Sequence, residues 1–93
     1  MVHNPFQNLV KNSETAIFTE ATIPEKLLSR HNTKQGVWGK LMVITGALDF
    51  VVDGPPSTIS RIEAGTYAVI EPTIYHHVQI IGPTTFRIEF YRG

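Results

Sequence analysis

The sequence predicts an all-β domain, either a sandwich or a small barrel, on three observations. Short segments alternate apolar and polar residues, most clearly at 84–92, where Phe86, Ile88 and Phe90 share one face. Glycine- and proline-rich turn signals separate these segments about every eight to twelve residues, a spacing typical of sandwiches and barrels. No heptad pattern and no long amphipathic helix is visible in the sequence.

The elements can be placed in order along the chain. Residues 1–14 are polar and turn-rich, so we expect an N-terminal arm there, followed by a single domain over residues 15–93. Residues 23–30 are expected to form a short helical turn, with Pro24 near its first position. Strands are expected at 15–23, 40–46, 47–54, 57–65, 66–72, 76–82 and 84–92.

Glycine and proline mark the expected connections between these strands. Gly46 is expected to form the tight turn of a hairpin between the strands on either side of it. The segment 53–57 (DGPPS) predicts a further turn, because proline restricts φ and glycine permits unusual φ values. Gly82 and Pro83 are expected to end the strand that precedes them.

Composition excludes several classes of function. Eight basic and eight acidic residues give a formal net charge of zero, which argues against a nucleic-acid or anionic-membrane partner. The chain has no cysteine, which excludes disulfides and fits a cytoplasmic location. Its N-terminus does not resemble a signal peptide, and no apolar run approaches the roughly 20 residues of a membrane span. Exposed strand edges in so small a domain predict a homodimer.

The histidines are the residues that suggest chemistry. In the segment 76–82 the two-residue period of a strand sends His76 and His77 to opposite faces. His31 lies far away in sequence, in the segment 30–40 (RHNTKQGVWGK). If His31 and His76 meet, they offer two imidazole nitrogens to a metal or a small ligand; otherwise each is a histidine hydrogen-bonded to the backbone.

Two segments resemble the motif regions of the cupin superfamily: 39–54 (GKLMVITGALDFVVDG) and 61–78 (RIEAGTYAVIEPTIYHHV). The resemblance implies a double-stranded β-helix, or jelly-roll barrel, with His76 facing inward as a metal ligand. Metal-binding cupins carry a second histidine where this chain has Thr33, and a glutamate where it has Trp38. The resemblance therefore implies that two of four expected ligands are missing.

At finer detail, residues 23–46, the IEP and HHV residues of the second motif and the terminal EFYR resemble the TehB/YeaR-like family, over roughly residues 15–92. Members are small cupin-type domains that occur alone or in front of the methyltransferase domain of tellurite-resistance protein B. The resemblance implies a role in tellurite, oxidative or nitrosative stress. No glycine-rich nucleotide loop follows a strand, so we expect no methyltransferase activity from this chain.

The candidate site follows from these observations. His31, His76 and Glu71 are the candidate ligands of a divalent transition metal such as Zn, Ni, Fe or Mn, with Glu89 as another candidate carboxylate. Lys34 or Arg30, both near His31 in sequence, is a candidate to neutralise an anionic ligand. A cross-strand polar ladder of Arg87, Glu89 and Tyr91 on an outer face is the alternative for that strand. Candidate residues of a ligand pocket are Trp38, which could equally pack in the core, Tyr75 and Lys34.

Three functions remain open on this basis. The favoured one is a binding or sensing module for a metal ion or small molecule. The second is a metal-dependent small-molecule enzyme such as a dioxygenase or isomerase, which needs three protein ligands and at least one open coordination position. Convergence of His31, His76 and Glu71 on one ion would favour it. The third is a ligand-free structural or interaction domain. No serine elbow and no phosphate loop is visible, so the catalytic residues, if there are any, are unknown.

Overall fold

The computed structural model describes residues 4–93; the first three residues of the expected N-terminal arm lie outside that range. The chain is mostly β-strand, as expected, and no helix among the described residues is long and apolar enough to cross a membrane. The elements are β1 (Val10–Glu14), β2 (Phe18–Thr19), α1 (Glu25–Leu28), β3 (Trp38–Val52), β4 (Thr58–Glu63), β5 (Tyr67–Ile70) and β6 (His76–Arg92).

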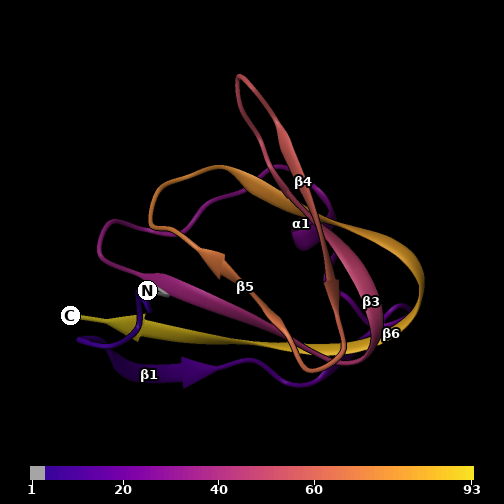
Figure 1. Ribbon diagram of the computed structural model, residues 1–93, viewed down its shortest axis with the longest axis horizontal. Coiled ribbons are helices and arrows are strands. Elements are labelled where there is room, and N and C mark those ends of the chain that lie inside the picture. The colour runs from indigo at the N-terminus through magenta and orange to yellow at the C-terminus, as the bar shows by residue number, and fades with distance from the viewer. Residues whose placement is uncertain (1–3) are drawn as a thin grey trace.

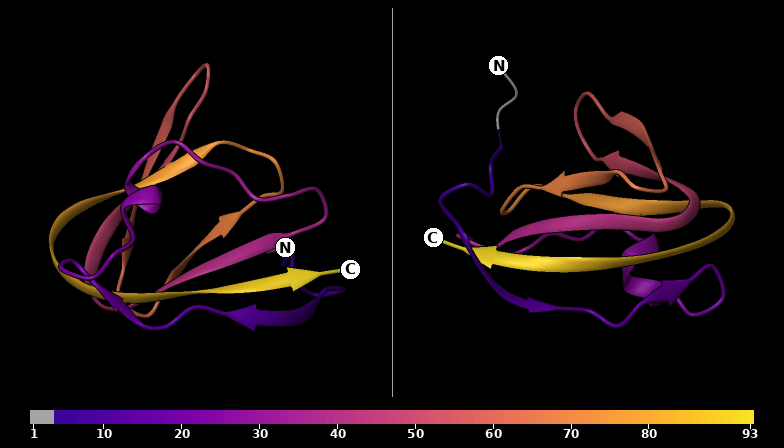
Figure 2. Two further views of the ribbon diagram at one scale, coloured as in Figure 1. Left: turned by 180° about the vertical axis from the view of Figure 1, so that it is seen from behind. Right: turned by 60° about the horizontal axis from the view of Figure 1, so that its bottom comes forward.

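Two long strands, β3 and β6, organise the sheet. They pair antiparallel along almost their whole lengths and curve together, as Figure 1 shows. The strand order is β1-β6-β3-β4, while β2 also pairs with β6 and β5 also pairs with β3. The further views in Figure 2 show the same strong curvature from other directions. This curvature brings the start of β6 toward the residues before β3, where the site lies.

The expected hairpin at Gly46 was wrong. Residues 38–52 form one continuous strand, with register shifts between Val43 and Thr45 and between Gly46 and Leu48. Gly46 has a φ of 69°, and a Cβ added there would overlap the carbonyl oxygen of Pro83. A glycine of this kind bends a strand at a β-bulge as readily as it closes a turn, which explains the misreading.

The expected end of a strand at Gly82 and Pro83 was also wrong. Residues 76–92 form one strand. Gly82 and Pro83 lie in a bulge of this strand, opposite the second register shift of β3, between Gly46 and Leu48. Proline has no amide hydrogen to donate to a neighbouring strand, but the extra residues of a bulge are not paired with that strand, so a proline is tolerated there. Both long strands are therefore bent at the same place.

The N-terminal region differs from the expectation at two points. Residues 10–14, the last part of the expected arm, form β1 and pair with β6. The strand expected at 15–23 is reduced to β2, because the Thr19 hydroxyl accepts the amide hydrogens of Ala21 and Thr22 and turns the chain. The helical turn is confirmed as α1, with Pro24 at its N-cap position.

The hydrophobic core lies between the two bent halves of the sheet. Phe86 and Ile88 are buried, and Phe90 packs against them, so the inward face expected for this segment is confirmed. The core cluster consists of Leu27, Leu41, Val43, Leu48, Phe50, Ile62, Ala68, Ile70, Val78, Phe86 and Ile88.

Candidate functional site

His31 and His76 are brought together by the backbone. The amide of His31 donates to the carbonyl of His76 at 3.0 Å, and the amide of His76 donates to the carbonyl of His31 at 2.8 Å. This isolated antiparallel bridge attaches the segment 29–37 to the first residue of β6. The two side chains therefore share one location although 44 residues separate them in sequence (76 minus 31, less one).

The two imidazole rings are in contact. Their centroids lie 4.3 Å apart with an interplanar angle of 70°, an edge-to-face arrangement. The His76 ring also lies 5.4 Å from the ring of Phe50. His76 is only 3% exposed, which confirms that it points inward, whereas His31 is half-buried.

Each ring is oriented by a hydrogen bond from its Nδ1 atom. His31 Nδ1 lies 2.8 Å from the carbonyl oxygen of Ser29, and His76 Nδ1 lies 2.9 Å from that of Ile74. A carbonyl oxygen only accepts, so each Nδ1 carries a hydrogen, and in the neutral ring the lone pair is on Nε2. Within residues 4–93, the hydrogen bonds of both rings are made through Nδ1 alone.

Burial favours the neutral form of the His76 ring. Burial lowers its pKa below the ordinary value of 6.5. The hydrogen bond to the Ile74 carbonyl opposes this shift, and the neighbouring His31 ring adds to it. A neutral imidazole with a free Nε2 is the form that binds a metal or accepts a hydrogen bond.

Two pockets meet at His76. The larger has a volume of about 250 Å³ and contains both histidines. The smaller has a volume of about 120 Å³ and contains His76 together with Glu71. Lys26, Leu27, His31, Asn32, Thr33, Ile70, His76, Ile88 and Phe90 line the larger pocket, and Phe50, Val52, Val69, Glu71, Ile74 and His76 line the smaller one.

Of the three candidate metal ligands, His76 lies between the other two, because it lines the larger pocket with His31 and the smaller one with Glu71. Among residues 4–93, no group of three or more histidine, cysteine, aspartate or glutamate side chains is placed to hold one metal ion. The structure therefore forms the histidine pair without a third protein ligand from the described part of the chain.

The other predicted pocket residues lie outside the linings of these two pockets. Tyr75 is 41% exposed, and the guanidinium of Arg30 lies 3.9 Å from its ring centroid. Trp38 is half-buried at the start of β3, where it pairs with Tyr91 of β6. Lys34 is exposed, and its carbonyl accepts the amide of Val37, so it forms part of a turn before β3.

Several lining residues were not predicted from the sequence. Ile88 and Phe90 were assigned to the inner face, but nothing in their pattern indicates that a pocket lies beside them. Lys26 reaches the pocket because α1 packs against β6, which is a tertiary contact. Asn32 and Thr33 are neighbours of His31, and this adjacency is the one sequence signal that could have found them.

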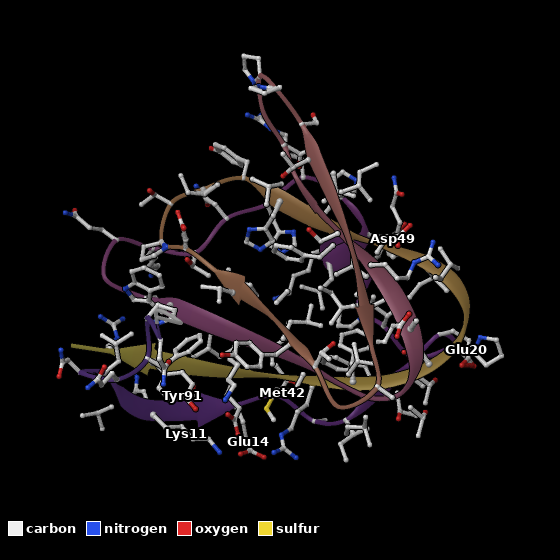
Figure 3. All side chains as sticks on the ribbon, viewed as in Figure 1. Lys11, Glu14, Glu20, Met42, Asp49 and Tyr91 are labelled. Atoms are coloured by element: carbon white, nitrogen blue, oxygen red, sulfur yellow. The ribbon has the colours of Figure 1, made fainter. Side chains whose placement is uncertain are left out.

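Glu89 belongs to a separate polar group on the outer face of β6, the Glu89 cluster, made of Lys11, Arg87, Glu89 and Tyr91. The Tyr91 hydroxyl donates to Oε1 of Glu89 at 2.8 Å, and Lys11 Nζ lies 3.0 Å from Oε2. Arg87 lies farther from Oε2, at 3.4 Å. Figure 3 shows Lys11 and Tyr91 beside β1, with Glu14 next to Lys11. Arg87 and Tyr91 each contact Glu89 as expected, but along β6 and not across strands; the cross-strand side-chain partner of Glu89 is Lys11 of β1.

These features define a small antiparallel β domain with a histidine pair between its two bent halves. Residues 13–88 match the TehB-like domain family. The match covers most of the chain, and the chain belongs to this family.

Two curated proteins are similar to this chain. The chain is 29% identical over 94 residues to "Uncharacterized protein YeaR" of Escherichia coli (strain K12), covering 91% of this chain and 79% of that protein. It is 38% identical over 42 residues to "Probable S-adenosyl-L-methionine-dependent methyltransferase TehB" of Haemophilus influenzae. That match covers 45% of this chain but only 15% of the methyltransferase.

Two crystal structures resemble the fold. One, of a protein from Escherichia coli (strain K12), has a TM-score of 0.84 at 28% identity and covers 98% of this chain and 96% of that one. The other, of TehB from Haemophilus influenzae, has a TM-score of 0.84 at 24% identity and covers 92% of this chain. This chain spans 32% of the TehB chain, so the likeness shows that it shares the fold of one part of that protein.

Proposed function

We propose that the chain is a binding module that holds a divalent transition-metal ion in the larger pocket, through Nε2 of His31 and Nε2 of His76. The observation that carries the proposal is the common orientation of the two rings, since both direct Nδ1 to a backbone carbonyl. Histidines that bind metals generally donate the other ring N–H to a carbonyl or carboxylate, which fixes the ring and raises its basicity. Two adjacent rings with this arrangement are prepared for a ligand that accepts nitrogen lone pairs.

The donor set suits zinc, nickel, iron or manganese, since imidazole is a ligand for each of them. Two protein ligands are fewer than catalytic zinc sites contain, and water or a small molecule would occupy the remaining positions. The small number of protein ligands favours a binding or sensing module over a metal-dependent dioxygenase or isomerase. It also favours an exchangeable metal over a structural one, because structural zinc sites have four protein ligands.

The wider role is proposed from the family. The curvature of β3 and β6, with His76 on the inner side, supports a cupin-type jelly-roll arrangement. We place the module in a cytoplasmic response to tellurite, oxidative or nitrosative stress, as a homodimer without methyltransferase activity of its own. A sensing role fits a site whose ligand can exchange.

Metal binding by untagged protein tests the proposal. Elemental analysis of purified chain, followed by calorimetric titration of the apoprotein with Zn²⁺, Ni²⁺, Mn²⁺ and Fe²⁺, should reveal about one equivalent of at least one metal. That metal should also raise the melting temperature, because it binds the folded state. Loss of a group that only orients a metal ligand costs about 10- to 100-fold in affinity. His31→Ala and His76→Ala each remove a ligand itself, so each should weaken binding by about 100-fold or more.

His77→Ala is the matched control. His77 adjoins His76 but lies on the opposite face, where its Nδ1 is 2.9 Å from Oδ2 of Asp53. This variant should bind metal like the wild type. Less than about a tenth of an equivalent of every metal in the wild type, with no change in melting temperature, would contradict the proposal.

A further inference from the structure

We propose that the larger pocket takes a small carboxylate with a short apolar chain, of about the size of butyrate. The inference rests on the proposed function in one respect: a metal on His31 and His76 would provide a second contact for the carboxylate. The contact with Lys26 and the apolar wall belong to the chain itself.

The charges around the pocket favour an anion. Lys26 is the one formally charged residue in its lining, which contains no aspartate or glutamate. Glu71 lines the smaller pocket instead, and Glu25, the sequence neighbour of Lys26 on α1, is exposed. Within residues 4–93, Lys26 takes part in no ion pair, so its ammonium group is available. Lys26 is an exposed residue of the pocket lining, as Glu25 is exposed on the same helix. A cation without a counter-ion attracts a negatively charged ligand, and salt screens that attraction at an exposed site.

The other polar side chains of the lining are already engaged. Asn32 Nδ2 donates to the carbonyl of Thr73 at 3.2 Å, and the Thr33 hydroxyl donates to the carbonyl of Val37 at 2.8 Å. These bonds hold the segment 29–37 in place. Asn32 keeps an Oδ1 acceptor and a second Nδ2 hydrogen, and the Thr33 hydroxyl can still accept a hydrogen bond. Among the polar groups of the lining, the Lys26 ammonium is the one that carries a formal charge to pair with a carboxylate.

The remaining wall requires an apolar part in the ligand. Leu27, Ile70, Ile88 and Phe90 contribute hydrocarbon to the same pocket. Burying an apolar chain against them is favourable by about 0.8 kcal/mol per CH₂ group. The volume of about 250 Å³ lies below the roughly 300–1,000 Å³ of pockets for drug-sized ligands, which suits a short chain.

Titration of the full chain with matched ligands tests the inference. Butyrate, n-butanol and n-butylamine share a four-carbon chain but differ in charge. Binding to the zinc-loaded and the metal-free protein would be followed by amide chemical shifts in two-dimensional NMR. Butyrate should bind at least about tenfold more tightly than butanol in both forms, because the Lys26 ammonium is present in both, and butylamine should bind most weakly. The shifts should concentrate at residues of the larger pocket.

Lys26→Gln should reduce the affinity for butyrate about tenfold and leave that for butanol unchanged. Lys34→Gln, which removes an exposed lysine outside the pocket lining, should change neither. Equal affinities for butyrate and butanol, an unchanged affinity in Lys26→Gln, or no butyrate binding in either form would overturn the inference. Absence of binding of all four metals would overturn the proposed function alone, since the titration of the metal-free protein still decides the carboxylate question.

Discussion

The histidine pair and the Glu89 cluster both contain a buried titratable side chain on β6, but they differ in how that side chain is satisfied. Both oxygens of Glu89 have partners, namely Tyr91 on Oε1 and Lys11 on Oε2. His31 and His76 have a partner at Nδ1, while Nε2 is left toward a pocket. On β6, therefore, the carboxylate of Glu89 on the outer face has partners at both oxygens, whereas the imidazole of His76 at the start of the strand has a partner at Nδ1 and none at Nε2 among the described residues.

The difference separates a structural role from a binding role. A polar group whose hydrogen-bonding atoms are all paired within the protein stabilises the fold and has nothing left for a ligand. A ring that is oriented at one atom and free at the other is arranged for something that the protein does not supply. By this criterion the Glu89 carboxylate is a structural group that connects β1 to β6, although Nε of Arg87 in the same cluster is buried without a hydrogen-bond partner among the described residues. The histidine pair, with Nε2 of each ring outside these hydrogen bonds, is the site.

Gly46→Ala should have the largest effect and should impair both regions. A methyl group at Gly46 would overlap the Pro83 carbonyl, and the φ of 69° is unfavourable for alanine. We expect a loss of about 3 kcal/mol or more in the free energy of unfolding, measured by urea denaturation. Gly82→Ala is the control, because a Cβ at Gly82 meets nothing within 4 Å; it should cost less than about 1 kcal/mol. Equal losses in the two variants would refute the bulge at Gly46 as the reason for the bend.

Glu89→Ala should destabilise the fold and spare the pocket. It leaves Lys11 and Tyr91 without their shared acceptor, and we expect a loss of about 2 kcal/mol in urea denaturation. Metal affinity should remain that of the wild type, because Glu89 faces away from Ile88 and the pocket. Glu14→Ala, at the exposed end of the same group, should change stability by less than about 0.5 kcal/mol. A loss of metal binding in Glu89→Ala would show that the two regions are coupled.

A smaller effect is expected from pH, in a different range for each region. The folded-state pKa of His76 lies below 6.5, so the unfolded chain binds more protons there, and stability should fall as pH decreases below about 6.5. Burial acts to raise the pKa of Glu89, but Lys11 and Tyr91 outweigh it and the pKa falls below 4.5. The Glu89 contribution should therefore be lost only below about pH 4.5.

Urea denaturation at pH 7.5, 5.5 and 3.5 would separate these two ranges. His76→Asn, whose amide can still donate to the Ile74 carbonyl, should reduce the loss between pH 7.5 and 5.5. Glu89→Ala should reduce the loss between pH 5.5 and 3.5. The opposite assignment, or no change in either variant, would contradict the pKa directions on which the prediction depends.

Most strands could be predicted from the sequence, and the connections that failed share one cause. The segments at 57–65 and 66–72 contain β4 and β5, and the alternation at 84–92 correctly gave the inner face of β6. Gly46 and the Gly82–Pro83 pair were read as interruptions, whereas they lie in bulges within continuous strands. Glycine and proline indicate only that the local backbone is unusual, and the neighbouring strand decides whether the chain reverses or bends.

The sequence by itself determined the alternation of the strands, the helical turn after Pro24 and the opposite faces of His76 and His77, because these follow from the local geometry of the chain. The tertiary structure decided that His31 lies beside His76, that Lys26 enters the same pocket and that Glu71 lines the neighbouring one. Those placements depend on a backbone bridge across 44 intervening residues and on the shared bend of β3 and β6. Contacts of this kind depend on how distant segments pack, which no local pattern contains.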